Sequence, residues 1–439
     1  MGILTFKGGI HPNDGKSLAK DQPIQELLPT GDLVYPLSQH IGAPAAPVVK
    51  KGDYVLKGQK IADAGGFVSA PIYASVSGTV KAIEKRLTPT GSIIDSIVIE
   101  NDGEYQEVEY APVKPLNELS GDEIRTLIAD AGIVGMGGAG FPTRVKLSPK
   151  EPEKIDYIIA NCAECEPYIT ADYRRMLENT EELVSGMRVV LSIFPNAKGI
   201  FGVEDNKKDC IEKLKEATKN EPRMEVKALQ TKYPQGAERQ LIYALTKRAI
   251  NSSMLPADAG CIVDNVETLI GIERAVIQGR PLMERIVTVS GDDVQKPGNY
   301  KVLLGTSHSE LIDAAGGFIQ EPEKLISGGP MMGFAMITLD APVTKTSSAI
   351  LAFKEDAVAK SSPSACINCG RCVEVCPSRI LPSRLADLAE RMDEEAFTAL
   401  NGLECVECGS CSYVCPAKRQ LKQAIGSMRK IALANRKKK

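Results

Sequence analysis

Two short runs of cysteine near the C-terminal end have the same spacing and hold eight of the twelve cysteines in the 439-residue chain. The runs are Cys366, Cys369, Cys372 and Cys376, and Cys405, Cys408, Cys411 and Cys415, each followed by a proline. This is the ligand spacing of bacterial two-cluster ferredoxins. Three thiolates so spaced can hold three corners of one cubane, while the fourth lies beyond the turn and serves the other cluster.

The spacing therefore predicts two 4Fe–4S clusters that exchange their fourth ligand. The expected ligand sets are Cys366, Cys369, Cys372 and Cys415 for one cluster, and Cys405, Cys408, Cys411 and Cys376 for the other. Structural zinc usually takes two close ligand pairs separated by a longer loop, and disulfides need an oxidising compartment. Apolar residues at helical spacing between Ser378 and Glu404 predict an α-helical ferredoxin module.

Strand and helix patterns alternate in the middle of the chain. Strand patterns lie at 155–160, 199–203 and 224–229, and helical patterns at 180–194, 206–219 and 237–248. This alternation predicts a parallel sheet with crossover helices, which binds ligands beyond the carboxyl ends of its strands. Residues 161–167 and 233–238 each follow a strand, so we expect them at that crevice.

A glycine-rich segment, Gly135 to Gly140, contains a formal G-x-G-x-x-G pattern. The residues before it, 122–133, have a helical pattern, whereas a dinucleotide fingerprint follows a strand. From these residues alone two interpretations remain open. The segment is either a flexible turn or a loop whose bare backbone approaches a phosphate or a flat ring. Nearby, Cys162 and Cys165 form a C-x-x-C pair, which is either a redox dithiol or two small buried residues.

Four motifs resemble the NADH-binding flavoprotein subunit of respiratory complex I. They are Gly135 to Lys146, Asn161 to Pro167, Gln235 to Glu238 and Asp264 to Thr268, in that family's order. Residues 6–12 and the two cysteine runs extend the resemblance. The whole chain is similar to the C subunits of Rnf complexes, the membrane-bound ferredoxin:NAD oxidoreductases that pump ions.

The resemblance implies FMN in the middle domain, with NADH stacked against it. The residues implied to hold FMN are Gly135, Gly137, Lys146, Asn161, Glu164, Gly236, Asn265 and Thr268. Phe141 is implied to stack on NADH, and Glu166 and Glu238 to hydrogen-bond the nucleotide. No acid or base residue is expected, because hydride transfer depends mainly on positioning. Ala163 and Ala237 stand where the complex I pattern has acidic residues.

The expected fold class is multidomain α/β with small β modules. The expected parts are an N-terminal arm (1–30), a lipoyl- or biotinyl-like barrel-sandwich domain (31–112), a Rossmann-like FMN/NADH-binding domain with a parallel sheet (113–282), a β-grasp, soluble ligand-binding domain (283–355), and a two-cluster ferredoxin-like domain with a basic tail (356–439). The modified lysine of carrier domains is missing, since 62–66 occupy the expected hairpin. A docking or covering role is therefore predicted for the barrel-sandwich domain.

Nicotinamide exchanges electrons in pairs and an iron–sulfur cluster exchanges them singly, whereas a flavin can do both. The expected function is thus a subunit that passes electrons between NAD(H), FMN, two 4Fe–4S clusters and partner subunits, with ferredoxin reached indirectly. One alternative is the cobalamin reductase of bacterial microcompartments. Another is a passive iron–sulfur wire whose nucleotide pocket has decayed, which the two alanines favour.

A net charge of −3 and the absence of tryptophan argue against a nucleic-acid partner. There is no run of about 18 apolar residues and no signal-peptide pattern, so we expect a peripheral protein on the cytoplasmic side of the cell membrane. The C-terminal segment is basic. Its apolar residues Leu421, Ile425, Met428 and Ala432 share one helical face, which predicts docking to anionic lipid or an acidic partner, the alternative being a solvated tail.

Overall fold

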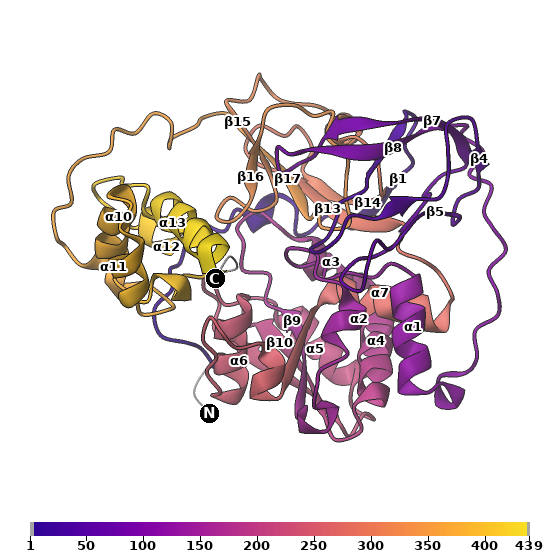
Figure 1. Cartoon of the computed structure of the whole chain (residues 1–439), viewed down its shortest axis with the longest axis horizontal. Helices are drawn as coiled ribbons and strands as arrows, with labels where there is room; N and C mark the ends of the chain where they lie inside the picture. The colour runs from indigo at the N-terminus through magenta and orange to yellow at the C-terminus, as the bar shows by residue number, and fades with distance from the viewer. Residues whose placement is uncertain (1–3, 437–439) are drawn as a thin grey trace.

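The computed structural model describes residues 4–436, which fold into four packed units. In Figure 1 the α/β domain forms the lower half of the molecule and two β-rich units lie above it. The helical ferredoxin module lies at one side, joined to the rest by a long segment after β17 (Ala349–Phe353). Within 4–436, no helix combines the length and the apolar character needed to cross a bilayer.

The barrel-sandwich domain encloses one core between two antiparallel sheets. The first sheet has the order β2 (Leu33–Pro36), β8 (Ile93–Asn101), β7 (Gly78–Leu87) and β4 (Tyr54–Val55), and the second has the order β3 (Ala46–Pro47), β5 (Lys60–Asp63) and β6 (Ile72–Tyr73). Inward-facing residues of these strands, such as Ile61, Val80 and Ile97, are fully buried. A hairpin of residues 64–71 connects β5 and β6.

The α/β domain confirms the predicted parallel sheet. Its order is β11 (Met224–Leu229), β10 (Lys198–Glu204), β9 (Tyr157–Cys162) and β12 (Cys261–Asn265). The main helices are α1 (Gly121–Asp130), α3 (Ala171–Glu178), α4 (Thr180–Ile193), α5 (Lys208–Ala217), α6 (Glu238–Thr246) and α7 (Val266–Ile277). From β9 the chain adds two strands on one side and then returns to place β12 on the other. The strand order therefore reverses between β9 and β12, which is where such sheets bind ligands.

A six-stranded mixed sheet forms the β-grasp domain. Its order is β1 (Ile24–Leu27), β14 (Gly298–Leu303), β13 (Glu284–Ser290), β17, β15 (Lys324–Ser327) and β16 (Phe334–Met336), and α8 spans His308–Ala314. β1 pairs in parallel with β14. The segment expected as an N-terminal arm therefore supplies an edge strand to a domain that lies more than 250 residues further along the chain.

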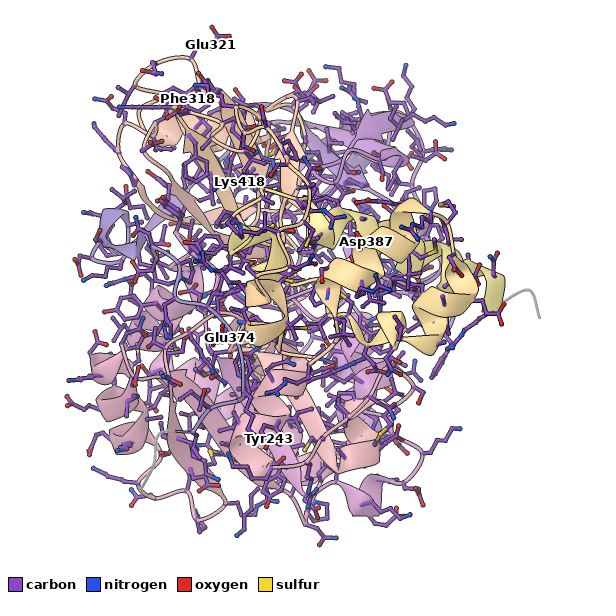
Figure 2. All side chains as sticks on the ribbon, turned by 90° about the vertical axis from the view of Figure 1, so that its left-hand side faces the viewer. Tyr243, Phe318, Glu321, Glu374, Asp387 and Lys418 are labelled. Carbon is purple, nitrogen blue, oxygen red and sulfur yellow. The ribbon has the colours of Figure 1, made fainter. Side chains whose placement is uncertain are left out.

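The ferredoxin module is helical, as the insert between the cysteine runs predicted. Its helices are α9 (Arg371–Glu374), α10 (Pro382–Glu390), α11 (Glu394–Ala399), α12 (Ser410–Tyr413) and α13 (Leu421–Arg436). Figure 2 shows the module from the side, with Asp387 of α10 and Lys418 facing the viewer and Tyr243 of α6 below them. Arg419 binds Asp387 at 2.9 Å and so fixes α10 beside the start of α13.

The prediction that the apolar face of α13 docks on lipid or a partner is wrong. Leu421, Ile425, Met428 and Ala432 are each at most 2% exposed, because they form the module's own core with residues of α10 and α11. An amphipathic pattern indicates that one face of a helix is buried, and here the other helices of the ferredoxin module bury it. The last expected basic residues, 437–439, lie outside the described residues.

The N-terminal segment joins the α/β domain to the ferredoxin module. The backbone N–H of Gly9 donates to the carbonyl of Val375 at 2.8 Å, and that of Ile10 donates to the carbonyl of Tyr233 at 2.8 Å. Gly9 has a φ of +86°, and a Cβ there would lie 2.8 Å from the Tyr233 oxygen. Only glycine combines this backbone conformation with such a close approach.

Candidate functional site

The reversal in strand order places two asparagines side by side at the carboxyl ends of β9 and β12. Asn161 and Asn265 are register partners across the two parallel strands. The Asn161 amide donates to the carbonyl of Gly236 at 2.8 Å, and the Asn265 amide donates to the Asp172 carboxylate at 2.6 Å. The strand ends thereby fix the turn that follows β11 and the start of α3. Three predicted site residues, Asn161, Asn265 and Gly236, meet at this crevice.

The glycine loop folds against the same strand ends. Met136 N–H donates to the Thr268 hydroxyl of α7 at 2.9 Å, and Gly135 N–H donates to the Phe141 carbonyl at 2.8 Å. The loop follows α1 rather than a strand, so its G-x-G-x-x-G pattern is not a dinucleotide fingerprint. Thr268, predicted to hold FMN, anchors the loop backbone through this bond.

The two faces of the glycine loop differ in a way that suits a flat ligand. A Cβ on Gly137 would lie 2.8 Å from Cβ of Asn265, so this side of the loop is packed against the crevice. A Cβ on Gly138 would have no neighbouring atom within 4 Å. Bare backbone beside open space allows a ring or phosphate to approach peptide N–H groups closely. These residues fit the FMN that the resemblance implies.

Lys146 lies at the other side of the crevice, at the end of α2 (Thr143–Lys146). Its ammonium donates to the Val263 carbonyl at 2.6 Å and to Oδ1 of Asp264 at 2.9 Å. The second oxygen of the buried Asp264 has no hydrogen-bond partner among the described residues. An unpartnered buried oxygen beside a lysine is typical of a site that a ligand or water completes. Glu238, in the first turn of α6, is exposed near this group.

Two of the predicted acidic residues are held by other parts of the protein. Glu164 is buried, accepts a 2.8 Å hydrogen bond from Asp172 N–H and lies 3.7 Å from the Lys16 ammonium. Glu166 accepts a 3.1 Å hydrogen bond from the N–H of Met331 in the β-grasp domain, and burial raises its pKa to about 7. One oxygen of each carboxylate, Oε2 of Glu164 and Oε1 of Glu166, has no hydrogen-bond partner among the described residues, so the implied roles toward flavin and nucleotide stay predictions.

A buried ion cluster that the sequence did not reveal supports the glycine loop. Arg285 of β13 donates to the Met136 carbonyl at 3.3 Å and lies 3.4 Å from Glu267, which also pairs with Arg175. Burial raises the pKa of the nearby Asp172 to about 7, with Glu164 adding to the shift. Of these charged residues, Glu164 and Glu267 fall within the four motifs, whereas Asp172, Arg175 and Arg285 do not. Arg285 comes from a different domain, so no local pattern signals its role.

Four cysteines line one pocket within the ferredoxin module, and one of them, Cys408, also packs against Tyr233 of the α/β domain. They are Cys376, Cys405, Cys408 and Cys411, the set predicted for the second cluster, including the exchanged ligand from the first run. A single zinc ion holds its thiolates about 3.8 Å apart. Among residues 4–436, no group of three or more candidate ligands is close enough to hold one metal ion.

The first ligand set lies nearer the surface. Cys366 and Cys369 are exposed, whereas Cys372 and Cys415 are half-buried and pack against the module's core. Figure 2 views the face on which Glu374 of α9, next to this run, lies. The two sets thus differ in position, because the second faces the α/β domain and the first faces solvent.

Cys165 lies between the crevice and the second cysteine set. Its thiol accepts a 3.3 Å hydrogen bond from Gly236 N–H and packs in one apolar cluster with Tyr233 and Cys408. Burial raises the pKa of Cys165 and of Cys162, so both thiols stay protonated. Neither is bonded to another cysteine. Their environment is that of small buried residues, as the sequence suggested.

Comparison with known proteins places these features in one family. The chain is 49% identical to the C subunit of the proton-translocating ferredoxin:NAD(+) oxidoreductase complex of Clostridium ljungdahlii, over 96% of this chain and 93% of that one. It is 44% identical to the C subunit of the Na(+)-translocating complex of Acetobacterium woodii, over 99% and 98% of the two chains. The chain belongs to this family of Rnf C subunits. The Rnf resemblance is thereby confirmed.

Family models agree with the architecture and the cofactor sites. The matches are the Nuo51 FMN-binding domain at 128–274, the RnfC barrel sandwich hybrid domain at 4–104, the SLBB domain at 286–335 and the 4Fe-4S dicluster domain at 354–419. They confirm the predicted FMN and 4Fe–4S clusters. An NAD+-reducing NiFe-hydrogenase in its air-oxidized state shares the fold, with a TM-score of 0.51 at 21% identity over 69% of this chain and 60% of that one.

Proposed function

We propose that this Rnf C subunit is the NAD(H)-reactive peripheral part of a membrane-bound, ion-pumping ferredoxin:NAD oxidoreductase complex. Electrons pass between NAD(H), FMN in the crevice, the buried cluster, the exposed cluster and a partner subunit. The names of the two relatives support the assignment to such a complex. The chain is held on the cytoplasmic side of the membrane by its partner subunits, and ferredoxin reaches it only through them.

The crevice residues have different proposed roles in binding FMN. Gly137 and Gly138 present bare backbone, Asn161 and Asn265 fix the strand ends, and Lys146 supplies positive charge for a phosphate or ribityl group. When bound, FMN accepts a hydride from NADH and passes the electrons on one at a time. Asp264 holds Lys146 in place through the 2.9 Å contact. None of these residues has to exchange a proton for hydride transfer.

The observation that carries this proposal is one continuous packed connection from the crevice to the second cysteine set. Gly236 contacts Asn161 on one side and the Cys165 thiol on the other. Tyr233, in the same turn, is 1% exposed and donates to the Cys408 carbonyl. A flavin at the crevice and a cluster on Cys408 are therefore separated by packed protein rather than by solvent.

Gly138 offers a test that leaves the fold intact. Because no atom lies within 4 Å of its Cβ position, Gly138→Leu places a side chain in the open space where we propose that FMN binds, without a clash in the protein. We expect the variant to match the wild-type circular dichroism and melting temperature, to bind FMN at least tenfold more weakly, and to lose FMN-dependent NADH oxidation with ferricyanide. Normal FMN binding by this variant would place the flavin elsewhere. If the wild-type chain with FMN cannot oxidise NADH although its clusters accept electrons from dithionite, the passive-wire alternative is correct.

A further inference from the structure

The hairpin of the barrel-sandwich domain lies against the glycine loop. Ile41 N–H donates to the Gly140 carbonyl at 3.2 Å, and Ala43 N–H donates to the Val68 carbonyl at 2.9 Å. Residues 41–43 thus connect the glycine loop to the hairpin residues 64–71. A Cβ on Gly65 would lie 2.0 Å from the Pro44 oxygen. The hairpin is therefore seated closely on its own domain, in a fixed position beside the crevice.

The hairpin carries a phenylalanine, Phe67, whose side chain is exposed to solvent. Phe67 is 68% exposed, although the chain has only nine phenylalanines and no tryptophan. Phe141, at the end of the glycine loop, is also exposed, at 36%. An exposed aromatic ring in this position is free to stack on a flat base.

An arginine of the α/β domain joins the two elements. The Arg144 guanidinium lies 6.0 Å from the centre of the Phe67 ring, at cation–π distance. Arg144 is exposed, and it pairs with no carboxylate within residues 4–436. It is in α2, the short helix that follows the glycine loop, and its side chain is directed to the hairpin, whereas that of Lys146 is directed to Asp264. An unpaired guanidinium beside exposed aromatic rings matches a ligand that has a flat base and phosphates.

We propose that Phe67 and Arg144 form the outer half of the NAD(H) site, with Phe67 stacked on the adenine ring and Arg144 paired with the diphosphate. This inference rests on the proposed function, since it extends the nucleotide site beyond the crevice and Phe141. The barrel-sandwich domain then has a binding role. A hairpin that carries a modified lysine in carrier domains presents here an aromatic ring to a nucleotide.

The kinetic test uses the full chain loaded with FMN, with ferricyanide as electron acceptor. Phe67→Ala is expected to raise the KM for NADH about tenfold, the effect of removing one base–aromatic stack, and to leave kcat within twofold. Phe67→Tyr keeps a flat ring and should restore the wild-type KM. Phe334→Ala is the matched control, because Phe334 is 53% exposed on β16, in another domain, and its loss should change neither constant.

A binding test separates the adenine half from the nicotinamide half. Because the chain has no tryptophan, Phe67→Trp provides a single fluorescent reporter. ADP-ribose, which lacks nicotinamide, should quench this emission on binding, whereas Phe334→Trp should not respond. ADP-ribose affinity should also fall about tenfold in Phe67→Ala and in Arg144→Gln, by calorimetry. Unchanged ADP-ribose affinity in both variants, while the wild type oxidises NADH normally, would overturn this inference and leave the proposed function standing. A wild-type holoprotein that binds no NADH would instead contradict the proposed function itself.

Discussion

The hydroxyl of Tyr233 donates a 2.7 Å hydrogen bond to the backbone carbonyl of Cys408. Tyr233 belongs to the turn after β11, and Gly236 of the same turn accepts a hydrogen bond from Asn161 at the crevice. One short turn therefore contacts both the proposed flavin site and a ligand of the buried cluster. The separation between the two redox centres is fixed by this turn, and not by the long segment that covalently links the domains.

Loss of the Tyr233 hydroxyl should weaken this contact. Tyr233→Phe leaves the Cys408 carbonyl without its donor, which costs about 1–3 kcal/mol for a buried acceptor. We expect a lower melting temperature for the ferredoxin module and a severalfold slower reduction of the clusters by NADH, measured by stopped-flow absorbance. FMN content and the rate of flavin reduction should match the wild type. Cluster reduction at the wild-type rate, with unchanged melting, would show that this bond does not hold the two centres together.

The N-terminal segment should be equally sensitive at Gly9. Gly9→Ala combines a φ of +86° with a Cβ only 2.8 Å from the Tyr233 carbonyl oxygen, so the segment must move away from the turn. We expect faster proteolysis of the segment between β17 and α9 and slower cluster reduction. Gly91→Ala is the matched control, since its φ is +79° but no atom lies within 4 Å. Equal proteolysis of the two variants would mean that backbone strain alone, and not the contact, explains the effect.

The exchange of fourth ligands predicts which cluster each cysteine variant loses. Cys376→Ala should remove the buried cluster although Cys376 belongs to the first run, and Cys415→Ala should remove the exposed cluster. Each variant should keep about four of eight irons per chain. Electron paramagnetic resonance of the dithionite-reduced proteins would identify the remaining cluster. If Cys376→Ala instead loses the exposed cluster, each run binds its own cluster and the proposed assignment is wrong.

Lys345 predicts a pH dependence of stability. Its ammonium is buried and donates to the carbonyls of Pro71 and Gly132, and burial lowers its pKa from 10.5 to about 7. Between about pH 7 and pH 10 the unfolded chain holds a proton that the folded chain lacks, so stability should rise with pH across this window. Below pH 7 both states hold the proton and the contribution becomes constant. Lys345→Met should remove this rise, measured as melting temperature against pH, and an unchanged profile would show that Lys345 stays charged in the folded protein.

The sequence predicted those features that depend on a local pattern of residues. The cysteine spacing predicted Cys376 as an exchanged ligand, and Cys376 and Cys408 line the same pocket. The alternation of strands and helices predicted the parallel sheet, and hence the crevice where Asn161 and Asn265 meet, because the periods of strands and helices are visible within short stretches of chain.

Contacts between segments that are distant in the chain could not be predicted from the sequence. Arg285 holds the Met136 carbonyl from another domain, and Glu166 accepts a hydrogen bond from Met331 of the β-grasp domain, because tertiary packing decides which distant groups a side chain meets. The apolar face of α13, which includes Ile425, is covered by its own module. Periodicity identifies a buried face and leaves its partner unspecified.

The central claim is that the crevice and the buried cluster form one electron path, and anaerobic reduction by NADH tests it most directly. The full chain is loaded with FMN, iron and sulfide, mixed with NADH, and followed by absorbance and electron paramagnetic resonance. The account predicts that flavin and cluster absorbance both decrease and that the signal of a reduced 4Fe–4S cluster appears, and that Gly138→Leu shows neither change. Reduction of the flavin by NADH, with clusters that remain oxidised until dithionite is added, would contradict it.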